Sequence, residues 1–154
     1  MEKQFASDFS LSDSSREKED SVAQYLLRRG DNPAHVHYGV SYFVKLADAR
    51  SKEVLDFLNR NIDMKSLEGK KVLDVGCGSG FLISALREMR IEAYGLDTEP
   101  ALLRVFGKKY GVAADALCIP FKDETFDAIL SLDVIEHLSS VPRGVRSMKS
   151  KVSK

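Results

Sequence analysis

The stretch Val72-Leu73-Asp74-Val75-Gly76-Cys77-Gly78-Ser79-Gly80 places three glycines at alternate positions directly after a short apolar run. Residues 71–75 form a short run in which Val72, Leu73 and Val75 are apolar, which is typical of a buried parallel strand. Glycines allow a tight turn and a close approach to a ligand because they carry no Cβ. The stretch therefore predicts a strand, a glycine turn and a helix from Gly80 to Met89, with a ligand at the carboxyl end of the strand.

The acid in this stretch distinguishes the turn from a dinucleotide-binding fingerprint. The spacing is G-x-G-x-G rather than G-x-G-x-x-G, and Asp74 stands two residues before Gly76. A carboxylate there would repel a pyrophosphate but attract an ammonium group. A nucleotide-dependent oxidoreductase is therefore the weaker reading, and a purely structural glycine turn in another α/β protein is the other alternative.

Strands and helices alternate in the pattern that follows Lys70. Apolar runs predict further strands at 91–96, 112–114 and 126–132. Helical spacing predicts helices at 100–110 and 141–152. Alternation of this kind predicts right-handed crossovers and an α/β fold with a parallel sheet.

The first third of the chain is predicted to be helical. Residues 1–13 are rich in Ser and Asp, which favours a disordered tail. Ser14 and Glu17 have the spacing of a capping box at the start of a helix, and a second helix is predicted from Ser41 to Arg60. We expect residues 14–66 to form a helical lid or cap and residues 67–154 to form the ligand-binding unit.

The composition excludes little. The 154 residues carry 23 Lys and Arg and 23 Asp and Glu, so the charge gives no reason to expect nucleic acid or an anionic membrane as a partner. No apolar run reaches the roughly 20 residues that span a bilayer. The two cysteines, Cys77 and Cys118, lack metal-ligand spacing and are expected to be reduced thiols, which favours a cytoplasmic location.

Three further motifs follow the glycine turn in chain order. Gly95-Leu96-Asp97 ends the second predicted strand, where a carboxylate can accept hydrogen bonds from ribose hydroxyls or cap the next helix. Ala114-Asp115-Ala116-Leu117 closes the third strand and could meet an adenine amino group. The stretch from Phe126 to Leu138 contains the fourth strand and then Asp133, Glu136 and His137, which we expect on the rim where a substrate enters.

Together these motifs resemble the small-molecule class of S-adenosylmethionine-dependent methyltransferases, in particular the group that includes ubiquinone-biosynthesis methyltransferases. The resemblance covers about Lys70 to Leu138 and rests on V-L-D-V-G-C-G-S-G, G-L-D, A-D-A with I-P-F, and F-D-A-I-L-S-L-D-V-I-E-H-L. It implies a Rossmann-like fold, S-adenosylmethionine as cofactor, a small-molecule methyl acceptor and no metal.

The resemblance also assigns roles to residues. Asp74 and the turn would line the methionine moiety, Asp97 and Thr98 the ribose, Asp115 and Ala116 the adenine, and Leu132 the sulfonium. The implied cofactor-binding residues are Asp74, Gly76, Cys77, Gly78, Gly80, Asp97, Thr98, Asp115, Ala116 and Leu132.

Two histidine features carry weaker predictions. Methyl transfer needs a general base only if the acceptor must lose a proton, and His137 is the candidate because its ordinary pKa lies near neutrality. A packing or capping role is the more ordinary interpretation of that residue. His35 and His37 form an H-x-H pair without an apparent third ligand, so two loop histidines are favoured over a metal site.

The family sheet normally has seven strands, and about four are predicted here. The fourth strand would then be an exposed edge, which invites pairing with another strand. We expect a truncated methyltransferase, a chain that pairs with a second copy or a partner, or a catalytically impaired cofactor-binding subunit. The sequence leaves these three alternatives open.

Overall fold

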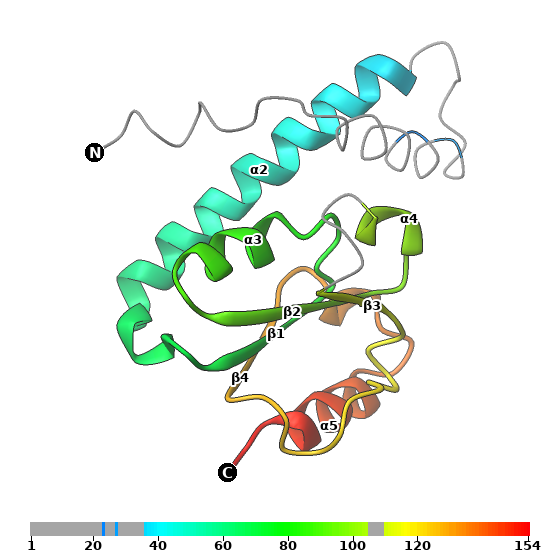
Figure 1. The fold of residues 1–154 in the computed structure, drawn as a ribbon. Coiled ribbons are helices and arrows are strands. Elements are labelled where there is room, and N and C mark those ends of the chain that lie inside the picture. Colours follow the sequence, from blue (N-terminus) through cyan, green and yellow to red (C-terminus); the bar gives the residue numbers. More distant parts are fainter. Residues whose placement is uncertain (1–22, 24–26, 28–35, 105–109) are drawn as a thin grey trace.

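A four-stranded parallel sheet forms the centre of the molecule (Figure 1). The computed structural model describes residues 36–104 and 110–154, together with Ala23 and Leu27. The strands are β1 (Lys71–Val75), β2 (Glu92–Asp97), β3 (Gly111–Ala113) and β4 (Ala128–Ser131), in the order β3-β2-β1-β4. All three pairings are parallel, so the predicted Rossmann-like α/β sheet is confirmed.

The strand order reverses direction at β1. The chain runs from β1 outward to β2 and β3, and then returns to place β4 on the other side of β1. The register pairs Val75 with Leu96 on one side and with Ser131 on the other. In open α/β sheets, ligands bind beyond the carboxyl ends of the strands at such a reversal. The glycine turn lies at this point because it directly follows Val75.

Helices cover both faces of the sheet and form two outer layers (Figure 1). The long helix α2 (Val36–Asn61), the 3₁₀ turn η2 (Met64–Leu67) and α3 (Phe81–Glu88) lie on one face. The helix α5 (Val141–Lys151) lies on the other face, preceded by the short 3₁₀ turn η3 (Ile135–His137). A one-turn helix, α4 (Pro100–Leu103), connects β2 towards β3.

The alternation of side chains along β1 builds one core on each face. Val72 packs with Val54 and Leu58 of α2 and with the apolar side of α3. Leu73 and Val75 point the other way and pack with Met148 of α5. β1 is therefore buried on both faces, which explains why it is mostly apolar.

Phe126 joins the second core to the end of the chain. Its ring meets Phe121 edge to face at a centroid distance of 5.0 Å and Tyr94 at 6.1 Å. Its backbone N–H donates to the carbonyl of Lys151 at 2.9 Å, and its carbonyl accepts from the N–H of Ser153 at 2.8 Å. Phe126 and Val152 thereby form a parallel bridge, on the side of the chain away from β1.

Several element boundaries differ from the prediction. α2 begins at Val36 rather than Ser41, because no proline follows Pro33 in this segment and a single interior glycine, Gly39, only weakens a helix. The predicted strand 126–132 is β-structured as β4 only from Ala128 to Ser131, since Phe126 pairs with Val152 instead of β1. The predicted helix 100–110 is helical from Pro100 to Leu103, and residues 105–109 lie outside the described residues.

The prediction for the N-terminus falls mostly outside the described residues. Ala23 and Leu27 are helical, as the predicted first helix requires. The tail at 1–13, the capping box and His35 are not among the residues that the structure describes. Within the described ranges, no helix is long and apolar enough to cross a membrane.

Replacing Phe126 by alanine tests the second core. Phe126 is 2% exposed, so Phe126→Ala is expected to lower the free energy of unfolding by about 3–5 kcal/mol, through lost burial and the cavity left behind. Urea denaturation measures the change. Phe57→Ala is the matched control, because Phe57 is 57% exposed and should cost little. Equal losses in the two variants would contradict the placement of Phe126 in the core.

Candidate functional site

The glycine turn is fastened to the end of β2 by three backbone N–H groups. Gly76 and Cys77 both donate to the carbonyl of Leu96, at 2.7 and 3.1 Å. Gly78 donates to Oδ2 of Asp97 at 2.8 Å. Gly76, Gly78 and Gly80 all have positive φ angles, of 79°, 53° and 78°, which side chains other than glycine rarely adopt. The alternate glycines are thus explained by the path of the turn.

Asp97 holds two segments of backbone at once. Besides the Gly78 bond, its Oδ1 accepts the N–H of Glu99 at 2.8 Å. The cap of α4 is Glu99 rather than Asp97, because the Glu99 carboxylate accepts the N–H of Ala101 at 3.2 Å. Each oxygen of Asp97 keeps acceptor capacity for a further donor, since a carboxylate oxygen has two lone pairs. Thr98, the other predicted ribose residue, is exposed beside it.

Asp74 is the charged residue buried in the centre of this site. It is 4% exposed, and the described part of the chain offers its carboxylate no hydrogen-bond donor. Burial, and then the nearby charge of Asp97, raises the pKa of Asp74 to about 7. A buried carboxylate without a partner is costly, so this position favours a ligand that brings a positive charge.

Cys77 lies inside the same turn as an unreactive thiol. Burial, followed by the charges of Asp74 and Asp97, raises the pKa of Cys77 well above its usual range. Because the thiolate is the reactive form, the side chain is suited to packing rather than to nucleophilic chemistry.

Two glycines of the site are needed for space. A Cβ on Gly95 of β2 would lie 2.3 Å from Cδ1 of Ile83 and 2.5 Å from Sγ of Cys77. These two side chains fill the position above Gly95. A Cβ on Gly76 would lie 2.2 Å from Cγ2 of Val134. Val134 therefore links the glycine turn to the loop after β4.

The segment after β3 reaches the same edge of the sheet. The N–H of Ala114 donates to the carbonyl of Asp97 at 3.0 Å, which places Asp115 next to the end of β2. Asp115 is exposed, and its Oδ1 accepts the N–H of Leu117 at 2.8 Å. Ala116 is buried, 4% exposed, in the second core. The structure thus places Asp115 at the sheet edge and Ala116 in the core beneath it.

The segment after β4 completes the edge. Leu132 packs partly buried against the first core. The Ser131 hydroxyl is buried and has no hydrogen-bond partner among the described residues. Asp133 adopts a left-handed backbone with φ 54°, a conformation that Asp tolerates better than most residues. Its carboxylate accepts from the guanidinium of Arg50 on α2 at 2.8 Å, which ties the long helix to this rim.

The remaining rim residues are exposed. Glu136 and His137 lie in η3, where the backbone N–H of His137 donates to the carbonyl of Val134 at 2.9 Å. His37 belongs to α2. Among the residues that the structure describes, no three His, Cys, Asp or Glu side chains gather where they could hold a metal ion.

The predicted site residues are brought together to different degrees. Asp97 contacts the turn directly at Gly78, and its charge acts on Asp74. Asp115 follows β3, and Leu132 follows β4. The sequence analysis missed Arg50, Ser131 and Val134. A polar residue ending an apolar strand could have indicated Ser131, whereas nothing local indicates Arg50 or Val134.

A separate groove lies at the opposite edge of the sheet. It has a volume of about 700 Å³ and is formed by the end of α2, by η2 and by the end of α3, which precede the amino ends of β1 and β2. An exposed ion pair of 3.2 Å between Glu68 and Arg90 lies along it. The candidate residues do not line this groove.

Comparison with known proteins identifies the family of the chain. Residues 73–153, more than half of the chain, match the family model described as Methyltransferase domain. The chain belongs to this methyltransferase domain family. S-adenosylmethionine is the cofactor that the family implies.

Relatives of this methyltransferase domain differ in their named substrates. A ubiquinone biosynthesis O-methyltransferase of Rhizobium etli is 31% identical over 106 residues, which are 64% of this chain and 43% of the relative. The human protein named Probable tRNA methyltransferase 9B is 30% identical over 110 residues, 70% of this chain and 23% of that protein. The methyltransferase domain therefore spans less than half the length of these curated relatives.

The fold comparison supports the same architecture. A solved structure from Methanococcus maripaludis, provisionally assigned as an S-adenosylmethionine-dependent methyltransferase, superposes on the methyltransferase domain with a TM-score of 0.57. It is 18% identical, and the match covers 73% of this chain and 53% of that one. At this identity the likeness concerns the fold alone.

Asp74→Asn tests the electrostatics of the buried acid. The folded-state pKa of Asp74, about 7, lies above its ordinary value of 3.8. Between these values the folded chain retains a proton that the unfolded chain has released, so the stability of the wild type falls as pH rises through this window. Asparagine carries no proton to lose. The variant is expected to gain roughly 2–4 kcal/mol relative to the wild type between pH 4 and pH 8.

Urea denaturation across this pH range measures the difference between the two proteins. Asp56→Asn on the exposed side of α2 is the control, and its stability should follow that of the wild type at every pH. A constant difference between Asp74→Asn and the wild type would contradict a raised pKa at Asp74.

Proposed function

We propose that this chain is an S-adenosylmethionine-dependent methyltransferase that acts on a small-molecule acceptor. The observation that carries the proposal is the spatial order of the strand ends. Asp115 follows β3, Asp97 ends β2, the glycine turn follows β1, and Leu132 follows β4. The strand order β3-β2-β1-β4 is also the order adenine, ribose, methionine and methyl group along the cofactor contacts inferred from the sequence.

The chemistry of the site fits this cofactor. The α-ammonium of the methionine moiety is the positive group that Asp74 lacks, since the Asp74 carboxylate is buried without a donor. A Cβ on Gly78 would meet nothing within 4 Å, so backbone is open at this point of the turn. Asp97 keeps lone pairs for the two ribose hydroxyls. A pyrophosphate at the turn would instead face the buried Asp74 carboxylate, which argues against a dinucleotide.

The binding roles follow from these positions. Asp74, Gly76, Cys77, Gly78 and Gly80 would hold the methionine moiety, mostly through backbone. Asp97 and Thr98 would hold the ribose, Asp115 and Ala116 the adenine, and Leu132 would lie near the sulfonium. The bound cofactor supplies an activated methyl group for in-line transfer to a nucleophilic atom of the acceptor. The protein contributes mainly by positioning that acceptor.

The acceptor would enter over the rim after β4. Asp133, Glu136 and His137 lie in this segment, and Arg50 holds Asp133 from α2. If the acceptor must lose a proton, His137 is the candidate base. The lid function proposed for residues 14–66, with residues 67–154 as the cofactor-binding unit, rests on the same Arg50–Asp133 contact.

The choice of a small-molecule acceptor rests on the relatives named for ubiquinone biosynthesis, and the relative named for tRNA makes RNA the alternative to test. Incubation with a radiolabelled methyl donor, a quinol-type phenol and transcribed tRNA distinguishes the two. Label in the phenol supports the proposal, and label in the tRNA alone would overturn this part of it.

The proposal also includes association of this chain with a second chain. A second copy or a partner pairing along β4 is supported by the position of β4 at the end of the strand order, with β1 as its only neighbouring strand in the described sheet. Sedimentation measures that association.

A cytoplasmic location is supported by the two free cysteines, Cys77 and Cys118.

Asp97→Ala tests cofactor binding. The change removes the ribose acceptor and also the anchor of the Gly78 N–H, so calorimetry should show S-adenosylmethionine affinity weakened by roughly 1–3 kcal/mol. Asp56→Ala, an exposed acid on α2, should bind like the wild type, and NAD should give no heat with any of the proteins. Unchanged affinity in Asp97→Ala would remove this residue from the site. Absence of S-adenosylmethionine binding by the folded wild type would overturn the proposed function.

A further inference from the structure

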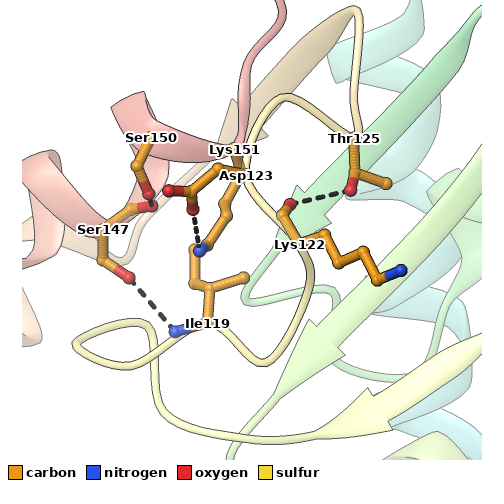
Figure 2. Close-up of polar contacts among 7 residues, drawn as sticks. All are labelled: Ile119, Lys122, Asp123, Thr125, Ser147, Ser150 and Lys151. Carbon is orange, nitrogen blue, oxygen red and sulfur yellow. Dashed lines mark hydrogen bonds and ion pairs between the residues drawn. The ribbon is translucent and has the colours of Figure 1, made fainter.

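The helix α5 holds the loop that follows Asp115 at two points, shown in Figure 2. The backbone N–H of Ile119 donates to the hydroxyl of Ser147 at 3.1 Å. Farther along, Nζ of Lys151 donates to Asp123. The hydrogen bond from Lys151, and then that from Ser150, lowers the pKa of Asp123. The loop is therefore fixed by a neutral contact near Asp115 and by an ion pair more distant from it.

The Ser147 contact differs in kind from the other hydrogen bonds of this loop. The N–H of Ala114 is satisfied by Asp97, and those of Leu117 and Cys118 are satisfied by Asp115 itself. These bonds shape the turn from within or attach it to β2. The N–H of Ile119 is the next donor along the chain, and its acceptor belongs to α5. Ser147 thus connects the completed turn to the helix layer beneath the sheet.

The side of α5 that carries Ser147 packs closely against the loop that follows Asp115. A Cβ on Gly144, one helical turn earlier, would lie 3.6 Å from Cδ2 of Leu117 and 2.4 Å from Cδ1 of Leu138. Met148 on the same side is 9% exposed and packs in the second core with Ile119, which is 5% exposed. The turn therefore rests on this side of α5 at Leu117 and at Ile119.

We propose that Ser147 is a positioning residue for adenine recognition. Its hydroxyl fixes the Ile119 N–H and thereby fixes the turn from Asp115 to Ile119, so that the Asp115 carboxylate is held where it accepts the adenine amino group. This inference rests on the proposed function, because it takes the adenine to lie beside Asp115. Ser147 itself acts through the loop and does not touch the cofactor.

Removing the hydroxyl should displace the carboxylate. Without Ser147 Oγ, the partly buried Ile119 N–H loses its acceptor and must move towards water, since an unsatisfied buried donor is unfavourable. Asp115 Oδ1 is joined to the same turn through the Leu117 N–H. A shift of the turn therefore carries the carboxylate with it, while the glycine turn and Asp97 keep their own hydrogen bonds.

The experiment compares two ligands that differ at the C6–N1 edge of the base. S-adenosylhomocysteine has the amino donor at C6 and an unprotonated N1, whereas S-inosylhomocysteine has a carbonyl oxygen at C6 and a proton on N1. Calorimetry on the full chain should show that the wild type prefers S-adenosylhomocysteine. In Ser147→Ala, affinity for S-adenosylhomocysteine should fall about tenfold, with S-inosylhomocysteine nearly unchanged, so that the preference is lost. Ser147→Thr keeps a hydroxyl and should restore the preference.

Ser150→Ala is the matched control on the same helix. The Ser150 hydroxyl lies 3.1 Å from the carbonyl oxygen of Ser147 and also lowers the pKa of Asp123 at the distant anchor. This variant should retain the wild-type preference for S-adenosylhomocysteine. Ser147→Cys, whose thiol is a weaker acceptor, should give an intermediate preference, and it serves in place of alanine if Ser147→Ala does not fold in a thermal melt.

The outcomes separate this inference from the function on which it rests. Equal weakening of both ligands in Ser147→Ala would indicate a merely structural role and overturn the proposal, and so would an unchanged preference. A wild type that binds neither ligand would instead contradict the proposed function. If Asp115→Ala keeps the wild-type preference, the adenine does not lie beside Asp115, and the assignment to Ser147 fails with it.

Discussion

Three N–H groups of the glycine turn fasten β1 to β2, and the rest of the site depends on this attachment. The Leu96 carbonyl accepts two of them, and the Asp97 carboxylate accepts the third. The turn can follow this path because its glycines adopt positive φ angles. The ladder between β1 and β2 pairs Asp74 with Gly95 and Val75 with Leu96, and these bonds extend the attachment into the turn, so that Gly78 keeps a fixed position relative to Asp97.

The two faces of the sheet contribute differently to this edge. On one face, α2 and α3 provide the first core, and α2 also reaches the rim through Arg50 and Asp133. On the other face, α5 supports the loops after β3 and β4 through Ser147 and through the close approach of Leu117 and Leu138 to Gly144. The edge residues are thus held by elements from both layers. The folded chain tolerates the unfavourable burial of the Asp74 carboxylate because the surrounding elements are stable. Such locally unfavourable groups are common at ligand-binding sites.

The sequence predicted the parts of the structure that local pattern determines. The apolar run before Gly76, the alternate glycines and the later alternation of strands and helices were sufficient for the sheet and for the positions of Asp74, Asp97 and Asp115. The sequence did not predict the contacts of Arg50 with Asp133 or of Ile119 with Ser147, which join residues 83 and 28 positions apart. Such pairs depend on tertiary packing and leave no periodic signal. The same holds for Phe126, whose pairing with Val152 shortened the predicted fourth strand.

Gly95 offers a further consequence. Its missing side chain is replaced by Sγ of Cys77 and Cδ1 of Ile83, which occupy the space where a Cβ would lie. The volumes at positions 77, 83 and 95 are therefore shared between a turn, a helix and a strand. Over evolutionary time these three positions are expected to vary together, with any gain in size at 95 accompanied by a loss at 77 or 83. The size of the side chain at position 77, between the first two glycines, is therefore limited by Gly95 of the neighbouring strand β2 rather than by the ligand.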